Sequence, residues 1–515
     1  MNRPFAQTEP QAPQPDEYRR LVAIQSEVAN LEHAAELLVW DQRTYMPSGG
    51  AESRGEQQAT LATLSHAKST SSEVGELLAR LADYEASLPF DSDEASLIRV
   101  SRRQYEKATR IPTELVAEHS RAATAGYAAW QRARQARDFA LFRPELERLV
   151  PIMQRITDAF GYDQSPLDPL IDMSEPGVTA AECENLFTGL REGLVPLVAA
   201  IAAASPGDED RIIRQHYPAD AQLAMGKEAV AAVGFDAERT GRVDLTIHPF
   251  TITLGAGDVR ITTRVREDDF SDCLYSLLHE AGHGVYEQGL PARLYRTPLF
   301  AGASSGFHES QSRLWENVVG RSLEFWTYFL PTAQHYFPEQ LAGADARDMY
   351  RAVNRVTPSL IRTEADEVTY NLHVMLRFEL EKSLLEGTLA VRDLSDAWND
   401  HMRSYLGITP PSDLEGVLQD VHWSRGPGGG FQGYTMGNVI ALQLFEAAER
   451  ACPGLSDDFA NGQFGRLFDW MRVNVHAHGA KYTPGELLHR LCGIGLDAAP
   501  YLRYLTDKYT RLYGL

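Results

Sequence analysis

A chain of 515 residues exceeds what a single hydrophobic core usually supports, so we expect two lobes or one large body with a cleft. Hydrophobic residues make up 43% and charged residues 23%, which is the balance of a folded globular protein and excludes a disordered chain. The formal net charge of −22 repels phosphate backbones and anionic lipids, so neither nucleic-acid nor membrane partners are expected.

The first 15 residues predict a flexible tail rather than a targeting signal. They are polar, carry several prolines and lack the apolar core of a secretory signal. Beyond them, no uninterrupted apolar run approaches the roughly 20 residues of a membrane span. The 4 cysteines are scattered without C-x-x-C pairing, which is typical of packing residues in a reducing compartment. We therefore expect a cytoplasmic protein.

Residues 16–240 predict an N-terminal helical lobe. Apolar residues recur there at spacings of three and four, as in Leu21, Ile24 and Val28, among strong helix formers. Pro and Gly interrupt this pattern at several places, where we expect one helix to end and the next to begin. These breaks fall at 47–50, 88–89, 111–113 and 165–166.

Residues 241–515 predict a second, catalytic lobe that begins with a small β-sheet at 241–265. Segments 243–247 and 259–263 are β-branched and alternate apolar with polar side chains, which predicts two short strands joined by a loop. That loop contains His248, Pro249, Gly255 and Gly257. Helical periodicity then resumes and continues to the end, apart from a Gly-rich loop at 426–433. We expect the two lobes to form a single structural unit.

The strongest motif is H-E-x-x-H at His279, Glu280 and His283, in a helical segment flanked by apolar residues. Residues four apart on a helix lie about 40° apart around its axis, so both imidazoles can hold one tetrahedral ion. A zinc ion lowers the pKa of its bound water from about 15.7 to about 7. The motif therefore predicts a zinc-dependent peptidase in which Glu280 is the general base on the metal-activated water.

A catalytic zinc site usually has three protein ligands, so one more is required. Glu287 lies one further turn along the same helix, about 6 Å of rise beyond His283, and would strain to reach the ion. Glu309 is predicted to lie on a second helix after a loop rich in Pro, Gly and Ser, from which it can approach separately. Glu309 is the predicted third ligand, with Glu316 as the alternative.

The order of these motifs resembles the carboxypeptidase Taq family of metallocarboxypeptidases, which are gluzincin-type enzymes. Its signatures follow one another here over residues 248–423. They stand at 248–250 (HPF), 258–262 (DVRIT), 279–283 (HEAGH), 308–311 (HESQ), 361–366 (IRTEAD) and 416–423 (GVLQDVHW). One such motif would be weak, but the complete set in register is specific, and the flanking helical lobes also match the family in length.

The resemblance implies a mainly α fold, neurolysin-like or ACE-like. Its large multi-helix body would have a deep central substrate groove, with residues 16–240 forming one wall and the small sheet lying next to the H-E-x-x-H helix. It also implies a homodimer that releases C-terminal residues from peptides with broad specificity. The cofactor would be one zinc ion per chain, with cobalt as the alternative metal.

The chain departs from the family in the loop after Trp423. Family members usually carry an aromatic-rich run there, whereas this chain reads GGGFQGY at 428–434 and keeps only Phe431 and Tyr434. The loss of the other aromatics and of a proline puts the rigidity of this loop and some substrate contacts in doubt.

Cleavage at a C-terminus requires a fixed cation for the terminal carboxylate, and the planar fork of arginine binds both oxygens. Arg362 and Arg260 are the candidates, each in a family signature; the alternative for either is a structural ion pair. His248 is predicted to border the groove, unless Pro249 merely ends a strand.

Donors aimed at the developing negative charge are also expected in such a site. His308, His422 and Tyr434 are the candidates, with a role in packing as the alternative. Asp366 and Asp420 are predicted to orient ligand or substrate-binding side chains, as carboxylates around a metal site do, or to cap helices instead.

Two other functions compete with carboxypeptidase activity. An endo-acting oligopeptidase or a dipeptidyl carboxypeptidase would share the same metal chemistry but release internal fragments or dipeptides. A catalytically silent peptide-binding protein would keep the fold, but the intact Glu280 argues against it.

Overall fold

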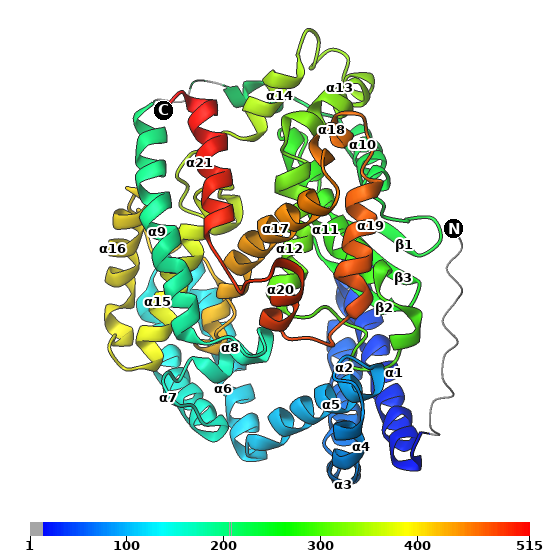
Figure 1. Cartoon of the computed structure of the whole chain (residues 1–515). Helices are drawn as coiled ribbons and strands as arrows, with labels where there is room; N and C mark the ends of the chain where they lie inside the picture. Colours follow the sequence, from blue (N-terminus) through cyan, green and yellow to red (C-terminus); the bar gives the residue numbers. More distant parts are fainter. Residues whose placement is uncertain (1–13, 205–206, 208) are drawn as a thin grey trace, which may run out of the picture. The chain divides into compact units, whose positions relative to one another are not determined.

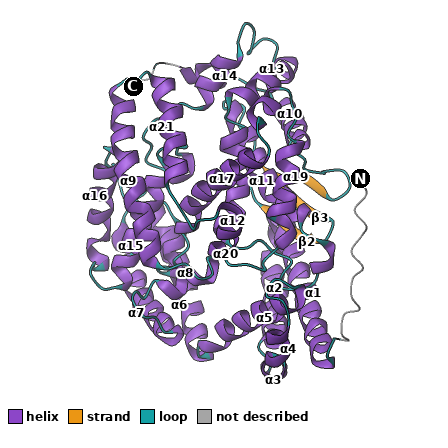
Figure 2. Cartoon of the chain, in the orientation of Figure 1, coloured by secondary structure: helices purple, strands orange, loops and turns teal. Residues whose placement is uncertain are grey.

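Helices dominate the computed structural model, which describes residues 14–204, 207 and 209–515. Helix accounts for 68% of the structure and strand for 4%. Figure 2 draws the many helices in purple and the few strands in orange. This confirms the expected mainly helical class with one small sheet. The expected tail lies, up to residue 13, outside the described residues. The chain divides into two compact units, residues 1–109 with 293–300 and residues 110–292 with 301–515.

Unit 1 is helical throughout its described part. Its helices are α1 (Asp16–Thr44), α2 (Ala51–Ser69), α3 (Ser72–Arg80), α4 (Ala82–Ser87) and α5 (Asp93–Arg110). Leu21, Val74 and Ile98, from three of these helices, are fully buried in one core. Leu294 and Leu299 enter the same core, which explains why the distant segment 293–300 belongs to this unit.

Unit 2 carries the later helices, labelled in Figure 1. They are α6 (Thr113–Ala136), α7 (Arg143–Phe160), α8 (Asp168–Ser174), α9 (Ala180–Ala203), α10 (Ala219–Ala232), α11 (Phe270–Gly289), α12 (Ser305–Arg313), α13 (Leu323–Tyr336), α14 (Ala346–Val353), α15 (Tyr370–Leu385), α16 (Leu394–Leu406), α17 (Gln432–Ala451), α18 (Leu455–Ala460), α19 (Gly465–Asn474), α20 (Pro484–Cys492) and α21 (Ala499–Tyr513). The expected breaks at Pro and Gly fall between the α-helices, except that Thr113 already begins α6, and residues 48–50 form a short 3₁₀ turn, η1 (Ser48–Gly50). The Gly-rich loop is shorter than expected, because α17 already begins at Gln432.

The division into units does not coincide with the expected boundary at residue 240. α9 packs against α21, α10 against α11, and α7 against α15, so helices from both sides of that boundary share contacts within unit 2. A uniform helical periodicity shows which face of each helix is apolar, but not which distant helix covers it. That residues 16–240 form one wall of a substrate groove, and the rest of the chain the catalytic lobe, stays a prediction.

The small sheet has three strands in the described residues, one more than expected. β1 (Gly241–Leu245) pairs in parallel with β3 (Asp258–Thr263), and β2 (Thr251–Gly255) pairs antiparallel with β3, in the order β1-β3-β2. β2 lies inside the segment predicted as a loop. Its β-branched Thr251, Ile252 and Thr253 favour a strand, and a tight turn with Gly257 at φ 82° returns the chain into β3.

One described helix, α9, is long and apolar enough to cross a membrane by length and composition. Its apolar stretch is interrupted by Arg191, which forms an ion pair with Glu379 of α15. The helix also packs against α16 and α21. These contacts are those of a core helix in unit 2, and the absence of a membrane partner stays a prediction.

α12 is held between α11 and α17 at very close range, and glycines make this possible. A Cβ at Gly282 of α11 would lie 2.4 Å from the carbonyl oxygen of Gln311. A Cβ at Gly437 of α17 would lie 2.4 Å from Cγ of Glu309. Any larger side chain would push the helices apart, because atoms in contact need about 3.5 Å between them. Gly282 thus sets the distance from α12 to the H-E-x-x-H helix, and Gly437 sets the distance from α12 to α17.

Candidate metal centre

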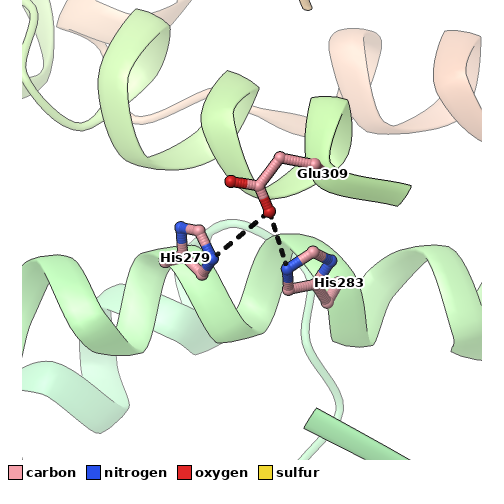
Figure 3. Close-up of side chains that lie close together, drawn as sticks. All are labelled: His279, His283 and Glu309. Atoms are coloured by element: carbon pink, nitrogen blue, oxygen red, sulfur yellow. Dashed lines mark ion pairs between the residues drawn. The ribbon is translucent and has the colours of Figure 1, made fainter. Parts of the chain in front are cut away.

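α11 presents His279 and His283 on one face, and Glu309 reaches them from α12, as Figure 3 shows. The Oε2 atom of Glu309 lies 3.7 Å from Nε2 of His279 and 3.5 Å from Nε2 of His283. One ligand atom from each residue lies within 4.8 Å of the other two. The structure therefore brings together the three side chains predicted as metal ligands.

These separations fit a divalent ion. Zinc binds imidazole nitrogen and carboxylate oxygen at about 2.0–2.2 Å, so neighbouring atoms of a tetrahedral set lie about 3.3 Å apart. The observed N···O distances of 3.5 and 3.7 Å are close to that edge and too long for ordinary hydrogen bonds. Two imidazoles and one carboxylate are also the usual donors of a catalytic site that keeps one position open.

The ring of His279 is oriented by Glu316. Its Nδ1 atom lies 2.8 Å from Oε2 of Glu316, which comes from a π-helical turn, η5 (Leu314–Val319), directly after α12. The carboxylate can only accept, so Nδ1 carries the proton and Nε2 keeps a lone pair on the side of Glu309. Glu316, the alternative third ligand, therefore lies behind the histidine and fixes its tautomer.

The ring of His283 is oriented by a relay that the sequence did not predict. His283 Nδ1 lies 2.6 Å from Nδ1 of His308, and His308 Nε2 lies 2.7 Å from Oε1 of Glu287. Glu287 accepts from His308 Nε2, so His308 Nδ1 accepts from His283 and leaves His283 Nε2 unprotonated. Thr253 of β2 donates to the other oxygen of Glu287 at 3.0 Å.

This relay corrects the role suggested for His308. Both of its ring nitrogens are occupied by protein partners, so neither is left to donate to a substrate oxygen. Glu287, which was set aside as a ligand on grounds of distance, instead holds His308. The sequence did contain a sign of this role: Glu287 lies four residues after His283, so both side chains lie on the same face of the helix.

Arg313, four residues further along α12, forms an ion pair with Glu309. Nε of Arg313 donates to Oε1 of Glu309 at 2.7 Å, and Nη1 donates to Oε2 of Glu316 at 3.1 Å. Burial raises the pKa of Glu309, but the charges of Arg313 and His279 outweigh it and hold that pKa well below its ordinary value. Glu309 is therefore ionised wherever the protein is folded near neutral pH.

Glu280 is buried beside the two histidines and is held by β2. The Thr251 hydroxyl contacts Oε2 of Glu280 at 2.7 Å and its carbonyl oxygen at 2.9 Å. Burial raises the pKa of Glu280, while His279 opposes the shift. A carboxylate whose pKa is shifted toward neutrality is a better proton acceptor near pH 7 than an ordinary glutamate.

Arg362, on the 3₁₀ turn η6 (Arg362–Glu364), is buried in a polar cluster. Its Nε and Nη2 atoms lie 3.3 Å from Oδ1 of Asp420, and Nη1 donates to the hydroxyl of Tyr370 at 3.1 Å. Asp420 also accepts from Nε of the fully buried Arg377 at 2.5 Å. Two arginines therefore share one carboxylate, which leaves a net positive charge near Tyr434, whose ring lies 5.0 Å from the Arg362 guanidinium.

The remaining predicted site residues have the following positions. Arg260 forms a two-pronged ion pair with Asp258, at 2.8 and 2.9 Å, which is the structural alternative weighed above. Asp366 accepts from the backbone N–H groups of Val368 and Thr369 and so holds the turn that precedes α15, a structural role close to the capping alternative. His248 is exposed on the turn between β1 and β2. His422, in the 3₁₀ turn η8 (Val421–Arg425), packs against Phe431 at 4.7 Å between ring centroids.

The Gly-rich loop that departs from the family is anchored by Glu381 of α15. Oε1 of this buried carboxylate accepts the backbone N–H of Gly428 at 2.8 Å. Gly429, at φ 63°, packs against Leu170, and a Cβ there would lie 2.7 Å from the leucine side chain. Backbone hydrogen bonding to a buried acid thus constrains the loop where the usual aromatics and proline are missing.

Comparisons with known proteins agree on one family. The model described as carboxypeptidase Taq (M32) metallopeptidase matches residues 20–509. Thermostable carboxypeptidase 1 of Thermus thermophilus is 42% identical over 506 residues, covering 96% of this chain and 99% of that protein. Carboxypeptidase 1 of Bacillus subtilis is 36% identical over 488 residues, covering 95% and 97%. The crystal structure of the M32 carboxypeptidase from Deinococcus radiodurans R1 has 48% identity and a TM-score of 0.94, covering 97% and 100%.

Proposed function

The chain belongs to the carboxypeptidase Taq (M32) family of metallopeptidases, and on this premise we propose that it releases amino acids from the C-termini of peptides using zinc. The observation that carries this proposal is the convergence of His279, His283 and Glu309 on one point. Membership of a metallopeptidase family implies a divalent ion. Zinc is preferred over cobalt because two imidazoles and a carboxylate are its usual catalytic donors.

The residues around this point divide the work of hydrolysis. His279, His283 and Glu309 would hold the ion, which when bound polarises water and the scissile carbonyl. Glu280, held by the Thr251 hydroxyl, takes the proton of the attacking water and passes it to the leaving amine. Glu316 and His308 keep the Nε2 atoms of the two histidines unprotonated and aimed at one position.

Selection for a C-terminus falls to Arg362 in this proposal. Asp420 holds its Nε and Nη2 atoms and Tyr370 holds its Nη1 atom, so the guanidinium has a fixed orientation. The second N–H groups of Nη1 and Nη2 would bind the terminal carboxylate. Arg377 shares Asp420, so the cluster keeps positive charge for an anionic chain end. Broad specificity, one ion per chain, a homodimer and a cytoplasmic location remain predictions.

A digest of one peptide in two forms tests the activity. The metal-loaded protein is incubated with a peptide that ends in a free acid and with its C-terminal amide, and the products are followed by mass spectrometry. Successive single-residue losses from the free acid alone support the proposal. Internal cuts or dipeptide release would instead identify an endo-acting or dipeptidyl enzyme, and activity that survives complete removal of divalent ions would refute the metal mechanism.

A further inference from the structure

We propose that Arg313 is a positioning residue that fixes which oxygen of Glu309 faces the metal and holds that carboxylate in place. The inference rests on the proposed function, because it takes Glu309 as a metal ligand. It goes beyond that function by assigning a role to an arginine, which as a cation without an acceptor cannot itself bind the ion.

The two oxygens of Glu309 have different partners. Oε1 accepts from Nε of Arg313 at 2.7 Å, on the side away from the histidines. Oε2 faces Nε2 of His279 and His283 at 3.7 and 3.5 Å and also accepts from the Ser312 hydroxyl at 3.2 Å. With Oε1 occupied, the carboxylate offers one oxygen to the ion, as a tetrahedral site with an open position requires.

Arg313 also joins two residues that act on different parts of the site. Its Nη1 donates to Oε2 of Glu316, the same atom that orients His279. One rigid guanidinium therefore fixes both the carboxylate ligand and the carboxylate behind a histidine ligand. Lysine could supply the charge but not the planar fork that spans both partners.

Packing keeps the guanidinium itself in place. The side chain of Arg313 is only 13% exposed, and its guanidinium carbon lies 4.5 Å from the ring centroid of Tyr370. A cation stacked on an aromatic face inside the protein loses little freedom when it binds its two carboxylates. The contacts of Arg313 with Glu309 and Glu316 are therefore formed before a metal ion binds.

A positioning role and a simple charge effect predict opposite results. Arginine is a cation beside a cation site, so by Coulomb repulsion alone its removal would tighten metal binding. If Arg313 positions Glu309, its removal weakens metal binding, because the freed carboxylate must be reordered by the ion. The direction of the change in zinc affinity therefore distinguishes the two effects.

The test measures the Zn²⁺ dissociation constant by competition with a chelator, together with the thermal stability of each metal-free protein. Arg313→Gln should weaken zinc binding by about 10- to 100-fold, and Arg313→Lys by less. Arg321→Gln is the matched control, because it removes another partly buried arginine, which lies 3.4 Å from Glu316 and has no ion pair with Glu309. We expect it to change zinc affinity by less than about threefold.

A double variant shows whether Arg313 acts through Glu309. In Glu309→Gln the charged ligand is gone, so adding Arg313→Gln should cause a smaller loss of zinc affinity than Arg313→Gln causes alone, the remainder acting through Glu316 and His279. Unchanged or tighter zinc binding in Arg313→Gln, or equal losses in Arg313→Gln and Arg321→Gln, would overturn the inference alone. Unchanged zinc binding in Glu309→Gln would overturn the ligand assignment of the proposed function as well.

Discussion

The substitution Gly282→Ala should separate the third ligand from the two histidines. The added Cβ would lie 2.4 Å from the carbonyl oxygen of Gln311 and 2.5 Å from Cα of Ser312, both backbone atoms of α12. Ordinary contact needs about 3.5 Å, so α12 must retreat by about 1 Å. Glu309 moves with α12, and its distances to the histidine nitrogens, now 3.5 and 3.7 Å, rise well beyond a tetrahedral edge of about 3.3 Å.

We expect zinc affinity to fall by at least about tenfold, the size of effect seen when a side chain that orients a metal ligand is removed. Overpacking costs about 1–3 kcal/mol of stability, partly offset by up to about 1 kcal/mol from the higher helix propensity of alanine. The assay is zinc content after dialysis and the zinc dissociation constant, with urea unfolding of the metal-free protein.

Gly189→Ala is the control for Gly282→Ala. It lies within α9, where a Cβ would meet no described atom within 4 Å, so it should stabilise the protein by about 0.5–1 kcal/mol and leave zinc binding unchanged. A Gly282→Ala protein that is less stable yet binds zinc as tightly as the original would refute the link between helix spacing and the metal site.

Three further predictions concern single side chains. Glu280→Gln should lower kcat by about 10²- to 10⁴-fold while zinc content is retained, and turnover equal to that of the original would exclude Glu280 as the base. His308→Phe keeps a ring against His283 but removes its acceptor, so zinc affinity, measured by chelator competition, should fall by about 10- to 100-fold. Burial raises the pKa of Glu381 from 4.5 to about 7, so the unfolded chain releases this proton at a lower pH than the folded protein. The contribution of Glu381 to the free energy of unfolding therefore falls as the pH rises from 4.5 to 7. Glu381→Gln keeps an acceptor for the backbone N–H of Gly428 but does not titrate. In urea unfolding, its free energy of unfolding should therefore fall by about 2 kcal/mol less than that of the original protein between about pH 5 and 8. Equal falls in both proteins would show that Glu381 is not the group responsible.

The sequence by itself determined the helix that carries the catalytic motif and the family. Two histidines four residues apart must share a helix face, because the α-helical repeat is fixed by local geometry. The ends of helices at Pro and Gly are local in the same sense. For these features the chain needs no information about distant residues. Glu309, which lies on another helix, was named from its motif with Glu316 as the alternative.

Only the tertiary structure decided what surrounds that motif. His279 is oriented by Glu316, 37 residues later, and Arg362 by Asp420, 58 residues later. Helical periodicity does not predict such pairs. Any carboxylate could accept the hydrogen bond, and only the packing of the helices determines which one lies close enough. The same applies to His308, which could be taken for a substrate donor until His283 and Glu287 were seen to occupy both of its nitrogens.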